Sequence, residues 1–414
     1  MNSDESDHEE LQSQRVLLLT LLDALKMASK DLQSNLFSLT NTDFSKSKTT
    51  FEALSKLEAE ADSPLSTDPN LFKLSQLLCN LNTLLEKLEK SQGYSLSSLL
   101  RRQITSYNIS QVAFTIEAEI QAILDRDNVQ ILARTLKDSE ADEDQKVKVL
   151  IEFRNRVCQG FNRDFQDLVL RAKVFSILET ILCDSMCSNR VRDQAALVID
   201  ALVRFNKNVF VGLVFMGPIV GALVSMGSCC SIQVLCSLIK FVRTPLIDEM
   251  ELNGEIPRII NLLSSEELPI QAAALDCILE LAYFGRKEVI EAILGEELVE
   301  KLMEMQRLEH GSEDLEKGQL SQPENERVCE GTEPETKIES KDRDSVQNYP
   351  FESCVARFAV QIEVGEGLNQ VEKREVKLEI LRRVRAASVS EAESATIESE
   401  VVVWTVVDIG WRRL

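Results

Sequence analysis

The fold is decided by residues 254–285, which read GEIPRIINLLSSEELPIQAAALDCILELAYFG and hold two apolar quartets in succession. In each quartet the residues follow the spacing i, i+3, i+4, i+7, which puts four side chains on one face of an α-helix. The quartets are Ile256, Ile259, Ile260 and Leu263, then Ala274, Cys277, Ile278 and Leu281. The stretch therefore predicts two consecutive amphipathic helices, each with one buried face.

The same pair of quartets occurs twice more upstream. The second quartets of the three pairs are separated by 40 and then 39 residues. The upstream pairs are Val174, Ile177, Leu178, Ile181 with Ala195, Val198, Ile199, Leu202, and Ile219, Ala222, Leu223, Met226 with Leu235, Leu238, Ile239, Val242. One helix pair cannot cover its own apolar face, whereas stacked pairs bury a continuous core. We therefore expect a helical solenoid rather than a plain bundle.

The third of these units resembles the armadillo family. Gly254, Ile256 and Pro257 match the Gly-x-Ile-Pro start of the family's repeat, and residues 274–282 match its third helix, with Glu280 in place of an asparagine. The resemblance covers 145–305 and extends to 349–400. It implies an all-α fold, in which an N-terminal helical bundle precedes a short armadillo-type α-solenoid. For function it implies a non-catalytic scaffold or adaptor that binds protein partners, whose identity the sequence does not give.

Composition divides the chain into six segments. They are an acidic lead at 1–12, an N-terminal helical bundle at 13–137, armadillo-like repeats at 145–305, an acidic insertion at 306–348, the last repeat with closing helices at 349–400 and a hydrophobic tail at 401–414. In the bundle, leucine spacing predicts helices at 14–39, 50–61 and 71–88, and another around 112–124. The lead and the insertion are expected to be disordered, because so few apolar residues cannot bury a core.

The bundle, the degenerate repeats and the C-terminal block together resemble plant armadillo proteins related to the U-box ubiquitin ligases. This resemblance gives the alternative function, a component of a ubiquitin-ligase system. No segment between the bundle and the repeats has a recognisable U-box, so ligase activity is not carried over.

Charge and cysteine content narrow the range of partners. The formal net charge of −22 argues against nucleic acid as a partner and against broad attraction to anionic lipid.

The uncharged run at 208–239 has the composition of a membrane span, but glycines and Pro218 interrupt it, and we favour burial of this run in the solenoid. Ten cysteines, mostly within apolar patterns, and no readable signal peptide favour a reducing compartment, cytoplasmic and also nuclear.

Catalytic and metal-binding patterns are scarce. The only histidines, His8 and His310, lie in the two segments expected to be disordered. No C-x-x-C pair and no P-loop motif occurs, and Gly365-Glu366-Gly367 lacks the third glycine of a dinucleotide fingerprint. We therefore expect no enzyme activity, no metal and no cofactor.

The third helices of the repeats supply the candidate binding residues. Armadillo proteins that hold extended peptides use an asparagine there, and the equivalent positions here are Ala201, Phe241 and Glu280. Basic residues nearby suggest a strip for an acidic partner, although a solvated face is the favoured alternative. The two tryptophans suggest an interface anchor, against the favoured alternative of a strand-prone tail packed on the last helices. The candidate partner-binding residues are Arg204, Lys240, Phe241, Arg243, Glu280, Arg286, Trp404 and Trp411.

Overall fold

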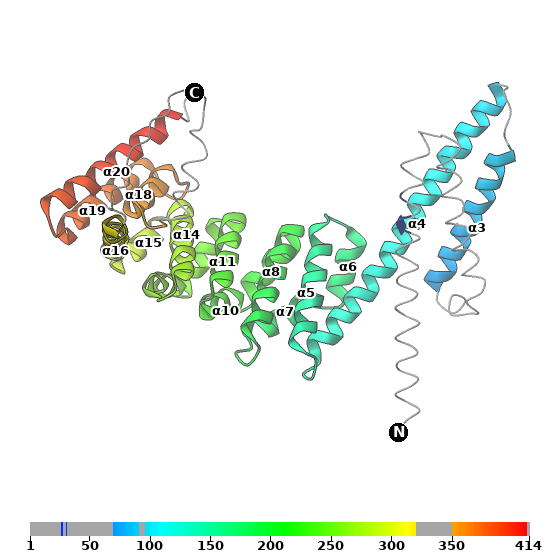
Figure 1. Cartoon of the computed structure of the whole chain (residues 1–414), viewed down its shortest axis with the longest axis horizontal. Helices are drawn as coiled ribbons and strands as arrows, with labels where there is room; N and C mark the ends of the chain where they lie inside the picture. The colour runs from blue at the N-terminus through cyan, green and yellow to red at the C-terminus, as the bar shows by residue number, and fades with distance from the viewer. Residues whose placement is uncertain (1–25, 28–29, 31–68, 91–95, 320–349, 412–414) are drawn as a thin grey trace. The chain divides into compact units, whose positions relative to one another are not determined.

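The computed structural model describes residues 26–27, 30, 69–90, 96–319 and 350–411, and every regular element in them is a helix (Figure 1). They fall into two compact units, one of Met1–Arg134 with Asn162–Val174 and one of Thr135–Phe161 with Phe175–Leu414. The acidic lead and the helix predicted at 50–61 lie outside the described residues. So does the helix predicted at 14–39, apart from Lys26, Met27 and Lys30.

The first unit contains the long helices α3 (Pro69–Lys90) and α4 (Leu96–Lys137), together with the short helix α6 (Arg163–Arg171). One face of α4 packs on α3 around a core of Leu74, Leu78, Leu81, Leu85, Leu88, Ile109, Ala113, Ile116 and Ile120. Four further apolar residues of α4 are 60–63% exposed, namely Leu100, Ile104, Tyr107 and Phe114. Since residues of an α-helix turn by about 100° each, these four lie on the side of α4 opposite the core.

The second unit repeats a set of three helices, where the sequence suggested two. The sets are α9 (Lys207–Met216), α10 (Ile219–Met226) and α11 (Cys229–Val242); α12 (Thr244–Leu252), α13 (Glu255–Asn261, continued by the 3-10 turn Leu262–Ser264) and α14 (Leu268–Phe284); and α15 (Lys287–Gly295), α16 (Leu298–Gln319) and α18 (Cys354–Val364). The helices α5 (Glu143–Cys158), α7 (Val174–Cys183) and α8 (Asn189–Phe205) precede them, and α19 (Gln370–Ala387) and α20 (Glu391–Trp411) follow.

The third helices of the sets stack in one row, in the order α5, α8, α11, α14, α18 and α20 (Figure 1). All three predicted second quartets are buried in this row. Each quartet belongs to a different third helix, so the stacking joins them into one core. The fold is thus an all-α solenoid of armadillo type, as the repeat pattern predicted.

Basic side chains cap the C-terminal ends of several helices in this unit. Arg192 Nε donates to the carbonyl of Leu182 over 3.1 Å, and Arg383 donates to that of Leu294 over 2.6 Å. Lys373 Nζ, which is buried, donates to Gly365 O over 2.8 Å. A helix C-terminus has unpaired carbonyls and a partial negative charge, so a cation is stabilising there. Some of the lysine and arginine side chains therefore stabilise helix ends within the fold.

The uncharged run at 208–239 is divided among three helices. Gly217 and Pro218 separate α9 from α10, and the two helix axes differ by 72°. No single helix in the described part of the chain is long and apolar enough to cross a bilayer, and α9 with α10 pass that test only as a bent pair. Phe210, Val214 and Leu223 of this pair are buried against neighbouring helices, in line with the favoured interpretation.

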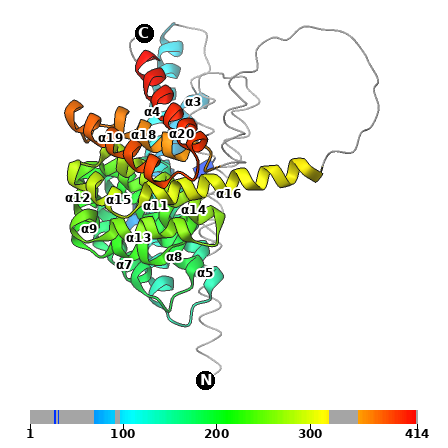
Figure 2. The ribbon, with the colours of Figure 1, turned by 90° about the vertical axis from the view of Figure 1, so that its left-hand side faces the viewer.

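Two C-terminal helices run further than the segment boundaries suggested. Helix α16 continues to Gln319 and includes His310, so residues 306–319 of the expected disordered insertion are helical, and Figure 2 shows α16 extending beyond its neighbours. Residues 320–349 lie outside the described part. Helix α20 continues to Trp411, so the expected strand-prone tail is helical, and Val401 at its predicted start is fully buried.

Candidate functional site

Polar side chains bridge each pair of neighbouring third helices from α8 to α18. Arg204 on α8 donates to Ser237 Oγ on α11 over 2.6 Å. Lys240 on α11 pairs with Glu280 on α14 over 3.3 Å, and Asp276 on α14 lies 3.7 Å from Arg357 on α18. We call the surface made by these residues the third-helix face; it consists of Asp200, Arg204, Ser237, Lys240, Phe241, Asp276, Glu280 and Arg357.

The four cations of the suggested basic strip each have a carboxylate partner. The N···O distances are 3.0 Å for Arg204–Asp200, 3.3 Å for Lys240–Glu280, 3.3 Å for Arg243–Glu366 and 3.2 Å for Arg286–Asp248. The strip is therefore a row of alternating charges and not an unpaired basic surface. Exposed ion pairs of this kind add only about 0–1 kcal/mol of stability each, so their groups remain available to a partner.

Phe241 is the aromatic residue of the third-helix face. Its half-buried ring has the Arg204 guanidinium 5.9 Å and Lys207 Nζ 5.3 Å from its centroid. Lys207 also donates to the carbonyl of Phe241 over 2.8 Å, which fixes it beside the ring. Cations over a ring hold it in place by electrostatic attraction. No sequence pattern pointed to Lys207, which lies 34 residues before Phe241.

The positions equivalent to the family's asparagine differ from one another in environment. Ala201 is buried, whereas Phe241 is half-buried and Glu280 is half-buried and paired with Lys240. Aligning the buried residues of α14 with those of α18 puts Gln361, also half-buried, at the next equivalent position. These four positions hold methyl, aromatic, carboxylate and amide groups, so each of the four third helices has a different group at the equivalent position.

Trp404 and Trp411 lie two helical turns apart on α20. Their side chains lie outside the described part of the structure. Before them, Val401 is buried while Val402 and Val403 are 46% and 54% exposed.

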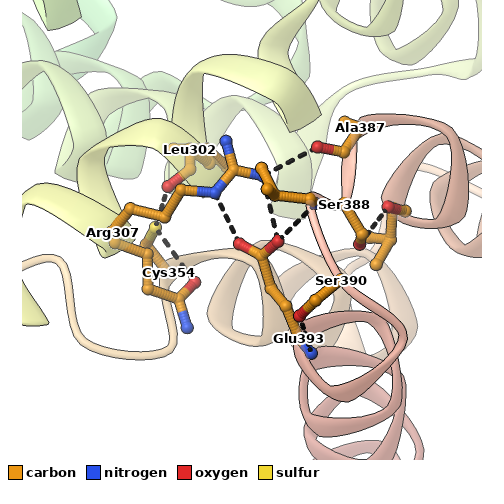
Figure 3. Close-up of polar contacts among 10 residues, drawn as sticks. Leu302, Arg307, Cys354, Ala387, Ser388, Ser390 and Glu393 are labelled. Carbon is orange, nitrogen blue, oxygen red and sulfur yellow. Dashed lines mark hydrogen bonds and ion pairs between the residues drawn. The ribbon is translucent and has the colours of Figure 1, made fainter.

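A polar clamp joins the helices on either side of residues 320–349 (Figure 3). Arg307 on α16 bonds Glu393 Oε1 on α20 over 2.5 Å and donates to the carbonyl of Ala387 at the end of α19 over 2.7 Å. Glu393 Oε2 in turn accepts from the Val389 amide over 2.7 Å. Ser390 caps the start of α20, because its Oγ accepts from the Glu393 amide over 3.1 Å. The clamp therefore attaches both closing helices to the last repeat.

We expect Arg307→Ala to lower the free energy of unfolding of the second unit by about 2 kcal/mol, since it leaves a half-buried carboxylate and a helix-end carbonyl without their donor. Chemical denaturation followed by circular dichroism measures this. Arg382→Ala is the matched control, because Arg382 only pairs along the surface of α19 with Glu379. A similar loss in both variants would contradict the clamp.

The clamp also predicts a dependence on pH. The hydrogen bond from Arg307 holds the pKa of Glu393 below its ordinary value. Because this pKa is lower in the folded chain than in the unfolded chain, the ionised carboxylate stabilises the fold. The stabilisation is fully present above the ordinary glutamate pKa of about 4.3, and it is lost as pH falls through the lower folded-state pKa. Arg307→Ala should therefore flatten the stability curve in this acid range.

Three thiols of this unit, one half-buried and two buried, are weak acids. Burial raises the pKa of Cys230 and of Cys236 to about 11, and that of Cys354 to about 12. They are protonated at neutral pH, and a protonated thiol is a poor nucleophile and metal ligand. Within the described residues, no group of three or more His, Cys, Asp or Glu is placed to hold a metal ion.

Comparison with known proteins gives structural neighbours but no sequence relatives. No protein-family model and no curated protein matches the chain. A designed armadillo-repeat protein matches at 14% identity and a TM-score of 0.39, with 65% of this chain and 98% of that chain covered. Another, in complex with the peptide (KR)4, matches at 16% identity and 0.39, covering 68% and 98%. An engineered protein matches at 14% identity and 0.38, covering 91% and 98%.

Proposed function

We propose that this chain is a non-catalytic scaffold that binds a protein partner on the third-helix face. The observation that carries the proposal is the continuity of this face. The row of stacked third helices presents an aromatic ring and alternating charges across four of its members, α8, α11, α14 and α18. Interfaces between proteins combine aromatic anchors with complementary charges in this way.

Phe241 is the residue on which binding is expected to depend most. Aromatic residues at the centre of an interface account for a large share of the binding energy, and this ring is already held by Arg204 and Lys207. The charged pairs around it would set which partner fits, because a surface with the wrong sign at any of them is repelled.

We expect Phe241→Ala to weaken partner binding by roughly ten- to thirty-fold, the loss of about 1.4–2 kcal/mol typical of an interface anchor. Affinity capture with the full chain, read by quantitative mass spectrometry, identifies the proteins that the variant fails to retain. Leu378→Ala is the control, since Leu378 is a 68% exposed apolar residue on α19, away from this face. If no protein is retained by the control and depleted by Phe241→Ala, the proposal fails.

A truncated chain separates this face from the tryptophan segment. The truncation should end after Val403 and not after Glu400, because removal of the buried Val401 would disturb the core. We expect the partner to be retained. If instead the truncated chain loses the partner while the Phe241→Ala variant retains it, then Trp404 and Trp411 are the residues that anchor the partner.

The alternative function in a ubiquitin-ligase system, the plant-type relationship and a cytoplasmic or nuclear location all stay predictions. A ubiquitylation assay with the purified chain tests the first directly.

A further inference from the structure

A second surface of the solenoid unit is hollowed by a pocket of about 720 Å³. Its walls come from the start of α8, from α9 and α10, and from α12 and α13. Val214, Phe215 and Val220 supply apolar atoms, while Arg192, Glu249 and Arg258 are among its polar groups. None of the lining residues belongs to the third-helix face, so this pocket is separate from the proposed partner surface.

Exposed apolar side chains lie next to this pocket in the chain. Met186 is 91% exposed, Met216 80% and Leu252 78%. Each directly adjoins a lining residue, since Ser185, Phe215 and Asn253 all line the pocket. Single exposed apolar residues are ordinary on protein surfaces. Here three of them are chain neighbours of residues that line one pocket, and two of the three are methionine, an adaptable side chain that is common at binding surfaces.

The pocket is also bordered by three carboxylates that have no ion pair with any described lysine or arginine. Glu249 is a lining residue and accepts a bond from the Asn253 amide over 2.9 Å. Asp184 lies between two lining residues, Cys183 and Ser185, and accepts from the Met186 amide over 2.9 Å. The third is Glu179, whose carboxylate fills the space where a side chain on Gly217 would begin.

The two arginines that line the pocket form no ion pair with these three carboxylates. Arg192 caps the carbonyl of Leu182, and Arg258 bonds Glu255 over 2.7 Å and Ser225 Oγ over 2.7 Å. Burial, and then the charge of Glu179, raise the pKa of the Cys183 thiol, while the charge of Arg192 lowers it. The pocket therefore combines apolar walls with a net negative border.

We propose that this pocket is a docking site for a cationic amphipathic segment of a protein partner. The apolar side chains of the segment enter the pocket and contact Met216 and Leu252. The lysines or arginines of the segment pair with Glu179, Asp184 and Glu249. The net charge of −22 attracts such a segment from a distance, and the unpaired carboxylates then select its position. The same charges repel nucleic acid and acidic peptides.

The test uses the full chain and two synthetic peptides of equal length and charge, one alternating lysine with leucine and one alternating lysine with serine. Their dissociation constants are measured by fluorescence anisotropy. One variant combines Glu179→Gln, Asp184→Asn and Glu249→Gln, which keep their local hydrogen-bond acceptors. The control combines Glu266→Gln, Glu288→Gln and Glu304→Gln, which remove the same charge at exposed carboxylates elsewhere in the unit.

We expect the lysine–leucine peptide to bind about ten-fold more tightly than the lysine–serine peptide. The pocket variant should weaken the lysine–leucine peptide by about ten-fold, and the control by no more than about two-fold. Met216→Ser with Leu252→Ser should bring the two peptides to equal affinity. Phe241→Ala should change neither, so this test and that of the third-helix face fail separately.

Equal weakening by the two charge variants would show attraction by net charge alone and overturn the proposal. Equal affinity of the two peptides for the unaltered chain would also overturn it, because no apolar contact would then be made. All the substitutions lie at exposed or half-exposed side chains, and unchanged thermal melting confirms that each variant is folded.

Discussion

Replacing Gly367 by alanine is expected to lower the free energy of unfolding of the solenoid unit by about 2–3 kcal/mol. A methyl group at this position would overlap the carbonyl oxygen of Gly285 at the end of α14. The main chain at Gly367 cannot easily shift away from Gly285, because the neighbouring amide of Glu366 donates to the carbonyl of Tyr283 over 2.8 Å. Overpacking a contact between two main chains costs energy through the shift that it forces.

Gly295→Ala is the matched control for this prediction. Gly295 is the last residue of α15 and has nothing within 4 Å of the position that a Cβ would occupy. Alanine there should raise the free energy of unfolding by about 0.5–1 kcal/mol, since it restricts the unfolded chain and favours the helix. Chemical denaturation of both variants measures the contrast. If Gly367→Ala is as stable as Gly295→Ala, the close approach of the two segments is not rigid.

The role of Gly365-Glu366-Gly367 could be predicted only in part from the sequence. The missing third glycine was enough to reject a dinucleotide site, but the pattern gives no hint of what the glycines contact. Their neighbours, Tyr283 and Gly285, are about eighty residues earlier in the chain. Such a contact depends on how α18 stacks on α14, which no local spacing records.

Prediction of the repeats succeeded where one helix face carried the whole signal. The second quartets are buried because apolar residues at i, i+3, i+4 and i+7 have only one core to face. The first helix of each set was missed for the opposite reason. Helix α9 is apolar on nearly every side and shows no clear period. Helices α12 and α15 have only nine residues each, and the buried residues of both begin with the spacing i, i+1 and i+4, which differs from the quartet spacing of the other helices.

The repeat register placed candidate binding residues on the third helices, but it did not predict the contacts that they make. Alignment of the repeats was sufficient to place Phe241 and Glu280 on third helices. Asp200, the partner of Arg204, is on the same helix, but the partners of the other three cations come from elsewhere in the chain, and Arg243 pairs with Glu366 from 123 residues away. Without these distances the basic residues looked like a strip of one sign. Pairing across helices is a property of the stacked structure, so it had to be observed.

The two faces of α4 are expected to respond in opposite ways to the same substitution. Ile116 is fully buried against α3, and Ile116→Ala should lower the free energy of unfolding of the first unit by about 2–5 kcal/mol, through lost burial and the cavity left behind. Ile104 is 61% exposed on the other side. Ile104→Ala should change the same quantity by less than about 0.5 kcal/mol, because no packing is lost and alanine favours the helix slightly.

Native-state hydrogen exchange of the α3 and α4 amides measures both variants in the full chain. Because the residue type and the helix are the same, the contrast depends only on which face is covered. Should Ile104→Ala destabilise the unit as much as Ile116→Ala, then the stripe of Leu100, Ile104, Tyr107 and Phe114 is covered in solution. Repeating the measurement over a range of protein concentrations would then separate a second copy of the chain, whose protection depends on concentration, from a segment of the same chain, whose protection does not.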